Sequence, residues 1–237
     1  MEGRFSRTEL LLGKEGLDRL SRSTVAVFGI GGVGSFVVEG LARAGVGHLV
    51  LVDHDTVSIT NINRQLHAMT ETLGRKKTEV MKERVLSIHP EAVVDVLDGF
   101  YLPDRAEEFF CCPYDYVVDA IDTVAGKVSL VLECRNRQIP IISSMGAGNK
   151  LDPTKFEVAD IYATSVDPLA RVMRRKLREH QVQALKVVYS KEEPAAIPPG
   201  AGCHGTKRPV PGSVSFVPSV AGMILAGEVV KALAGGL

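Results

Sequence analysis

A buried strand, a glycine-rich turn and a helix follow one another near the start of the chain. Residues 24–28 form a continuous apolar run, Thr-Val-Ala-Val-Phe, which is typical of a strand covered on both faces. Apolar residues continue through 34–44 at helical spacing, and Gly45 ends that helix. Between the two, glycines stand at Gly29, Gly31, Gly32 and Gly34. Such a turn lets backbone N–H groups and a helix N-terminus approach a phosphate, so the pattern predicts a nucleotide-binding unit.

Strands and helices alternate along the rest of the N-terminal part of the chain. This alternation favours a Rossmann-like, doubly wound α/β fold with a mainly parallel sheet. We assign residues 1–145 to this nucleotide-binding domain. The strands that we expect after the first are 48–52, 92–97, 116–120 and 140–143, and the later helices are 75–87 and 126–137.

After Met145 the regular alternation of strands and helices gives way to a turn-rich stretch. Residues 146–237 are predicted to form a C-terminal extension packed on the same domain. Proline and glycine concentrate in 193–212, which indicates an extended or mobile crossover loop. A closing helix is expected after Pro218. The extension is further predicted to hold strands at 156–160 and 182–189 and a helix at 168–180.

Charge and cysteine content exclude several classes of function. Lys+Arg and Asp+Glu number 28 each, so no global field attracts nucleic acid or membranes and any such affinity needs a local patch. None of the four cysteines forms a C-x-x-C pair, so we expect no structural zinc. The N-terminus lacks an apolar signal-like core, and the apolar run near 220–233 carries Glu228 and Lys231, so we expect no membrane span and a cytoplasmic protein.

Asp53 stands at the tip of the second predicted strand, 19 residues after Gly34. A carboxylate at this place reaches ribose hydroxyls in dinucleotide-binding folds. The glycine turn and Asp53 together fit an NAD-dependent dehydrogenase as well as an ATP-dependent enzyme.

An ordered set of charged and polar residues separates these two alternatives. The glycine turn alone can hold a pyrophosphate, whereas added cations and a free carboxylate suit more phosphate charge with a divalent metal. We therefore predict ATP and Mg²⁺ as the ligands of this site. The set comprises Asp53, Asp55, Asn61 and Arg64, then Lys77 after Gly74, and Asp122 after a later strand.

These motifs resemble the E1-like (ThiF/MoeB/HesA) adenylating superfamily. The stretches that carry the resemblance are G-x-G-G-V-G-S, L-V-D-x-D-x-V-x-x-x-N-x-N-R-Q, G-x-x-K and D-A-x-D, between about Arg4 and Ser144. The resemblance implies an ATP-binding adenylation domain in which Asp53 holds ribose. It also implies that Arg64 and Lys77 hold phosphates with Asn61 nearby, and that Asp122 lies by the metal and the reacting carboxylate.

The N-terminal Arg4-Phe5-Ser6-Arg7 resembles a further motif of this superfamily, R-[YF]-x-R. In relatives, the second arginine reaches across a homodimer to the partner's ATP. The resemblance therefore implies a homodimer with Arg7 acting in trans; the alternative is an exposed terminal arginine without a role.

Within the superfamily the chain is most similar to the branch of tRNA threonylcarbamoyladenosine dehydratases. The shared stretches include Asn63–His67, Ile141–Ala147, Leu151–Thr154, Asp167–Ala170 and Phe216–Gly222. The resemblance implies that ATP adenylates the carboxylate of N6-threonylcarbamoyladenosine in tRNA. An atom of the same side chain then closes a ring and releases AMP. Because an intramolecular nucleophile has a high effective concentration, no catalytic thioester is required.

Four arginines follow one face of the predicted helix 168–180, at spacings of three, four and seven residues. Such a stripe can hold an RNA backbone although the whole chain is neutral, and the alternative is a solvated helix face. The predicted tRNA-binding residues are Arg171, Arg174, Arg175 and Arg178.

Two other functions remain open from the sequence. An E1-like enzyme of another branch would activate the C-terminus of a ubiquitin-like sulfur-carrier protein. An NAD-binding oxidoreductase or nucleotide sensor would bind NAD and release no pyrophosphate. Cys203, beside His204 in the predicted crossover loop, could also serve with a sulfur-relay protein partner, although a bystander thiol is favoured.

Overall fold

β1 (Thr24–Phe28) is the third strand of a seven-stranded sheet in the computed structural model, which describes residues 3–198 and 210–236. The strand order is β3-β2-β1-β4-β5-β7-β6, and every neighbouring pair is parallel except β6 with β7. This confirms the predicted doubly wound, mainly parallel fold. The other strands are β2 (His48–Asp53), β3 (Val93–Asp98), β4 (Tyr116–Asp119), β5 (Ile141–Ser144), β6 (Phe156–Asp160) and β7 (Lys186–Ser190).

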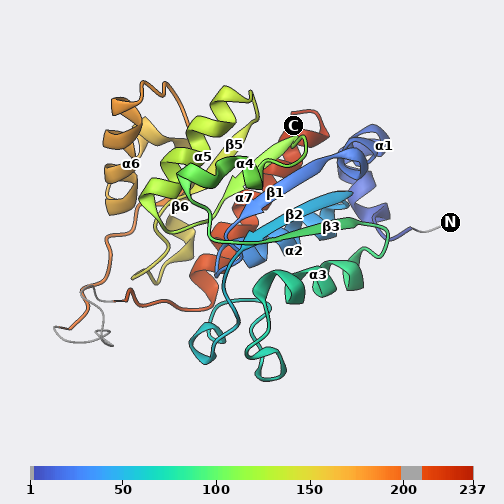
Figure 1. Ribbon diagram of the computed structural model, residues 1–237, viewed down its shortest axis with the longest axis horizontal. Helices are drawn as coiled ribbons and strands as arrows, with labels where there is room; N and C mark the ends of the chain where they lie inside the picture. Colours follow the sequence, from blue (N-terminus) through green and yellow to red (C-terminus); the bar gives the residue numbers. More distant parts are fainter. Residues whose placement is uncertain (1–2, 199–209, 237) are drawn as a thin grey trace.

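Helices cover both faces of this sheet (Figure 1). One face packs against α1 (Ser6–Arg22), α2 (Gly34–Ala44), α3 (Lys77–Ile88) and α7 (Phe216–Ala234). The other face packs against α4 (Ala106–Phe109), α5 (Val124–Asn136) and α6 (Pro168–Glu179). Successive residues of β1 alternate between the two cores, since Val25 and Val27 face the first and Ala26 and Phe28 face the second.

The residues after 145 continue the same sheet. β7 pairs with β5, and β6 turns back along β7 as an antiparallel edge strand. Of the described helices, α7 alone is long and apolar enough to cross a membrane by length and composition. Its Val217, Ala221 and Leu225 are buried in the core shared with α2 and the sheet, which is the packing of a core helix in a globular domain.

Several predicted element boundaries are wrong. α3 begins at Lys77 instead of 75, and α5 begins at Val124 instead of 126. β7 begins at Lys186 instead of 182, because Val182 N–H bonds back to Leu177 O and closes α6. α7 begins at Phe216, before Pro218. A proline is tolerated there because the first turn of a helix has no internal acceptor for its N–H.

Candidate functional site

A cavity of about 430 Å³ lies at the carboxyl ends of the parallel strands. Its walls come from the segments that follow β1, β2, β3, β4 and β5, together with residues 210–213 and Pro218. In doubly wound sheets this edge, where the strand order reverses between β1 and β4, is the place where ligands bind. Nine of the residues predicted from sequence line the cavity: Gly29, Gly31, Gly32, Asp53, Asp55, Asn61, Arg64, Lys77 and Asp122.

The glycine turn is shaped by close backbone approaches. Gly29 has a φ of +87°, and a Cβ there would lie 2.7 Å from Ala120 O. A Cβ at Gly34 would lie 1.7 Å from Gly29 O, so any side chain would disrupt the turn. Gly34 is the first residue of α2 and is not part of the cavity wall. Its role is therefore to bring the positive end of α2 beneath the cavity, while Gly31 and Gly32 face it.

Asp53 joins the end of β2 to the glycine turn. One carboxylate oxygen accepts the Ile30 N–H at 2.6 Å, and the other accepts the Asp55 N–H at 2.9 Å. A carboxylate offers about four lone-pair sites, so each oxygen keeps one for a hydroxyl group in the cavity. This geometry suits a carboxylate that positions the phosphate-binding turn and accepts from ribose.

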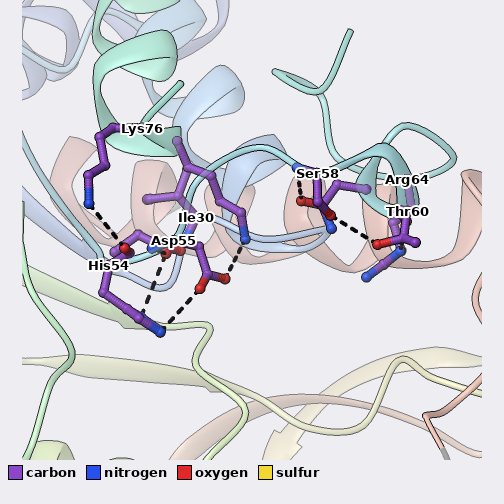
Figure 2. A network of polar contacts seen from close by, with 10 residues as sticks. Ile30, His54, Asp55, Ser58, Thr60, Arg64 and Lys76 are labelled. Atoms are coloured by element: carbon purple, nitrogen blue, oxygen red, sulfur yellow. Dashed lines mark hydrogen bonds and ion pairs between the residues drawn. The ribbon is translucent and has the colours of Figure 1, made fainter. Parts of the chain in front are cut away.

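Lys77 is the most deeply buried cation of the cavity wall, with 4% of its surface exposed. Its Nζ donates to Asp55 Oδ2 at 2.7 Å, and His54 Nε2 lies 3.1 Å from the other oxygen of that carboxylate (Figure 2). Burial opposes ionisation of Asp55, but the hydrogen bond and charge of Lys77 outweigh it and lower the pKa of that carboxyl. The ammonium is thus held at the cavity by a charged partner that a phosphate can replace.

Arg64 and Asn61 come from the segment between β2 and α3. Arg64 Nη1 donates to Thr60 O at 2.8 Å and to Asn63 Oδ1 at 2.9 Å (Figure 2). Asn61 is buried, and its Oδ1 accepts the Ser58 N–H at 3.0 Å. Asn61 therefore fixes the turn that carries Arg64, which keeps a second cation within the cavity wall.

Asp122 is exposed in the segment after β4, and no hydrogen bond or ion pair of its carboxylate occurs within residues 3–198 and 210–236. Beneath it, Lys127 and Asp119 are both fully buried, with Nζ 2.9 Å and 3.0 Å from the two carboxylate oxygens. Ser143 also donates to Asp119. This network fixes the segment that places Asp122 in the cavity wall.

The loop after β5 forms the opposite wall and is held from several sides. Gly146 N–H donates to Asp167 Oδ2 at 3.1 Å, and the same carboxylate accepts the Ala170 N–H at 2.8 Å as the N-cap of α6. Asn149 exchanges two hydrogen bonds with Gly212, of 2.8 Å and 2.6 Å. The loop therefore connects the cavity wall both to α6 and to the C-terminal end of the predicted crossover loop.

Arg7 lies away from the cavity of its own chain. Its neighbour Phe5 packs edge-on against His89 and contacts Gly45, at the edge where β2 and β3 begin. The cavity is at the other edge, so Arg7 does not join the predicted set within one chain.

The four arginines of α6 are not equivalent. Arg174 donates to Thr164 O and Oγ1, and the guanidinium of Arg178 lies 5.1 Å from the centre of the Tyr162 ring. Arg171 and Arg175 are exposed and form no ion pair with any described residue. Cys203 lies outside the described residues.

Sequence reasoning missed several residues of the cavity wall. Gln65 directly follows Arg64, and its Oε1 is buried without a hydrogen-bond partner among the described residues. His54 and Phe100 pack edge-on at 4.7 Å on the rim. Both follow the ends of strands, so the rule that ligands bind at carboxyl ends could have found them.

Comparison with known proteins adds a near full-length match. The chain is 50% identical over 239 residues to the tRNA threonylcarbamoyladenosine dehydratase of Bacillus subtilis, covering 97% of this chain and 94% of that protein. It is 47% identical to the Haemophilus influenzae enzyme of the same name, covering 75% and 68%. The crystal structure of the Escherichia coli tRNA N6-threonylcarbamoyladenosine dehydratase in complex with ATP matches with a TM-score of 0.87 and 36% identity, covering 97% and 93%.

A representative of the alternative branch is more distant. The molybdopterin-synthase adenylyltransferase of Escherichia coli is 31% identical and covers 66% of this chain and 64% of that protein. The ThiF family matches residues 5–236, which include every described element from α1 to α7. The chain therefore belongs to the ThiF family.

Proposed function

We propose that this protein is an ATP-dependent tRNA threonylcarbamoyladenosine dehydratase. The observation that carries the proposal is the match over nearly the whole chain to enzymes of that name, including one solved with ATP. The cavity supports the proposal. Its wall combines the glycine turn and two cations with Asp53, which is placed to bind ribose, and with the carboxylate of Asp122, which is unpaired among the described residues.

The reaction consists of two transfers at the cavity. A carboxylate oxygen of the threonylcarbamoyl group attacks the α-phosphorus of ATP, an acyl–phosphate bond forms and pyrophosphate leaves. An atom of the same side chain then attacks the acyl carbon, the ring closes and AMP leaves with the carboxyl oxygen. The nucleoside loses one water in total, and the intramolecular attack makes a thioester unnecessary.

The described residues divide these tasks. Gly31, Gly32 and the N-terminus of α2 face phosphate, while Asp53 accepts from ribose. Arg64 and Lys77 neutralise the charge that develops on the α-phosphate and on pyrophosphate. Asp122 offers an exposed carboxylate for Mg²⁺, which would neutralise phosphate charge when bound. The hard oxygen ligands of ATP and Asp122 fit this metal.

A homodimer in which Arg7 acts in trans extends this proposal. Arg7 lies at the sheet edge opposite the cavity, so only another copy of the chain can bring it to a bound ATP. Leu10 and Leu11 on α1 are 85% and 82% exposed, which gives a second copy an apolar surface next to Arg7.

The basic face of α6 is the proposed contact for the tRNA backbone, in a protein that we place in the cytoplasm. Arg171 and Arg175 point outward for phosphate, whereas Arg174 and Arg178 are tethered within the chain. Through Asp167, α6 is bonded directly to the loop that lines the cavity. A sulfur-relay protein partner would act through Cys203, and full turnover by a Cys203→Ser variant would remove that role.

Mass spectrometry of tRNA nucleosides tests the proposal. After incubation with the protein, ATP and Mg²⁺, the modified adenosine should become lighter by the mass of one water. Without ATP it should not change. Pyrophosphate exchange that a ubiquitin-like carrier protein stimulates and tRNA does not would instead support the sulfur-carrier alternative.

A further inference from the structure

A second cavity, of about 360 Å³, lies at the C-terminal end of α6. It is lined by Tyr162, Arg178, Gln181, Val182 and Gln183, none of which belongs to the ATP cavity. The turn between α6 and β7 builds it, at the edge where the parallel strands begin. The volume is within the range of small-ligand sites.

Hydrogen bonds hold the floor of this cavity together. Tyr162 Oη donates to Val182 O at 2.6 Å, which fixes the ring, and Val182 N–H donates to Leu177 O at 3.0 Å. Arg135 Nη1 donates to His180 O at 3.1 Å from the neighbouring helix α5. Gln181 has a φ of +55°, an uncommon value for a residue other than glycine. The exposed amides of Gln181 and Gln183 are therefore held at the rim by a defined backbone.

The guanidinium of Arg178 lies over the Tyr162 ring and is exposed on its other side. Arg137 over Phe110 is the comparable pair, at 4.7 Å, but its guanidinium donates to Glu133 and Glu107. Arg178 forms no ion pair with any described residue. The nearby Asp160 carboxylate is occupied, because it accepts the N–H groups of Tyr162 and Leu185. The cavity thus presents a flat cation on an aromatic base with no internal carboxylate.

This combination is the chemistry that binds an unpaired RNA base. Single-stranded bases stack on aromatic rings and on arginine planes, and amide side chains read their polar edges. The path along α6 from the ATP cavity to the second cavity also suits an RNA chain. α6 begins beside Gly146, which precedes the cavity-lining Ala147, and its 12 residues span about 18 Å to the second cavity. Arg171 and Arg175 point outward between the two cavities.

We propose that the cavity of Tyr162, Arg178, Gln181 and Gln183 binds an unpaired nucleobase of the tRNA loop that carries the modified adenosine. The inference rests on the proposed function, because it takes tRNA as the substrate. One base stacks on the Arg178 plane while the modified nucleotide occupies the ATP cavity, and the backbone between them follows α6. The site contributes to the affinity for tRNA and determines which nucleotide reaches the ATP cavity. It takes no part in the chemistry.

The test compares Arg178→Lys with wild type, using tRNA that carries threonylcarbamoyladenosine. Lysine keeps the charge but loses the planar group, so a phosphate contact survives and a stacking contact does not. The Kd of Arg178→Lys should rise at least about fivefold, with an unchanged dependence on salt. Arg137→Lys is the matched control, because it also removes an arginine from an aromatic ring, and its Kd should stay at the wild-type value.

A fluorescent base analogue gives a second reading, which reports the contact of one base in place of the overall affinity. With 2-aminopurine placed in turn at each loop position, wild-type protein should change the fluorescence at one position strongly, and Arg178→Lys should abolish that change. Equal Kd and equal fluorescence for Arg178→Lys and wild type would overturn the inference. If the wild-type protein then still removes water from the modified nucleoside, the proposed function stands without the base-binding cavity. If the wild-type protein neither binds nor converts the tRNA, the proposed function and the base-binding cavity both fail.

Discussion

Lys77 Nζ and Asp55 Oδ2 lie 2.7 Å apart in the wall of the ATP cavity. The lysine is buried and its partner carboxylate is exposed, so the ammonium is held in place before any phosphate arrives. A cation that is already positioned needs little reorganisation when negative charge develops beside it, and such groups stabilise developing charge most effectively.

Replacement of Lys77 by alanine should therefore lower turnover by about 10²- to 10³-fold, the cost of removing one preorganised charge-stabilising group. The adjacent Lys76 is the control, because it is exposed and pairs with Asp98 at 3.1 Å outside the cavity. The kcat of ATP-dependent AMP release measures both variants. Equal kcat values for Lys77→Ala and Lys76→Ala would show that Lys77 does not stabilise charge in the reaction.

The buried pair of Lys127 and Asp119 should matter for stability. Lys127→Ala leaves the Asp119 carboxylate buried without its cation, which costs about 3–5 kcal/mol of unfolding free energy. Lys14→Ala, at an exposed position of α1, should change that free energy by less than about 0.5 kcal/mol. Urea unfolding measures both. The double replacement Lys127→Met with Asp119→Leu should recover part of the loss, since it removes the unpaired charge.

His67 should make stability depend on pH. It is 2% exposed with no hydrogen-bond partner among the described residues. Burial and, to a smaller extent, the charge of Lys77 lower the pKa of His67 to about 4. Because the unfolded chain binds the proton near the ordinary pKa, its stabilising contribution is complete above about pH 6.5 and falls as the pH drops towards 4.

The comparison with His67→Leu isolates this effect. Between pH 7 and pH 5, the wild-type unfolding free energy should fall by roughly 2 kcal/mol more than that of the variant, which has no group to protonate there. Chemical unfolding at the two pH values provides the measurement. Parallel losses in both proteins would show that His67 is not the buried neutral base described above.

Mixing experiments test the role of Arg7 in trans. Arg7→Ala and Lys77→Ala homodimers should each be nearly inactive. A mixed dimer would contain one cavity with an intact Lys77 and an intact Arg7 from the partner. Random exchange of subunits should therefore restore about a quarter of wild-type turnover. If Arg7 acted within its own chain, or had no role, the mixture would equal the mean of the two separate proteins.

The sequence predicted the sheet and most of the cavity because both depend on local patterns. The apolar run of β1 and the Gly29 turn determine the nucleotide-binding unit, and parallel strands bring Asp53 and Asp122 to one edge. Gly34 belongs to the same motif, but only the structure shows that Gly29 O approaches it so closely that no side chain fits there.

Long-range contacts explain what the sequence left out. The wall formed by Gly148 and Pro211 depends on hydrogen bonds between Asn149 and Gly212, which are separated by more than sixty residues. The tethering of Arg174 depends on a contact nearer in the chain, with Thr164 in the turn before α6. Helical spacing places the α6 arginines on one face, but it does not show which of them are already bonded within the fold.

The most direct test of the central claim follows one oxygen atom. The threonylcarbamoyl carboxylate of the tRNA is labelled with a heavy oxygen isotope, and the AMP formed after one turnover with ATP is analysed by mass spectrometry. If the carboxylate attacks the α-phosphorus and ring closure expels AMP, each AMP should carry one labelled oxygen. Cyclised nucleoside accompanied by unlabelled AMP, or by ADP in place of AMP, would contradict adenylation at this cavity.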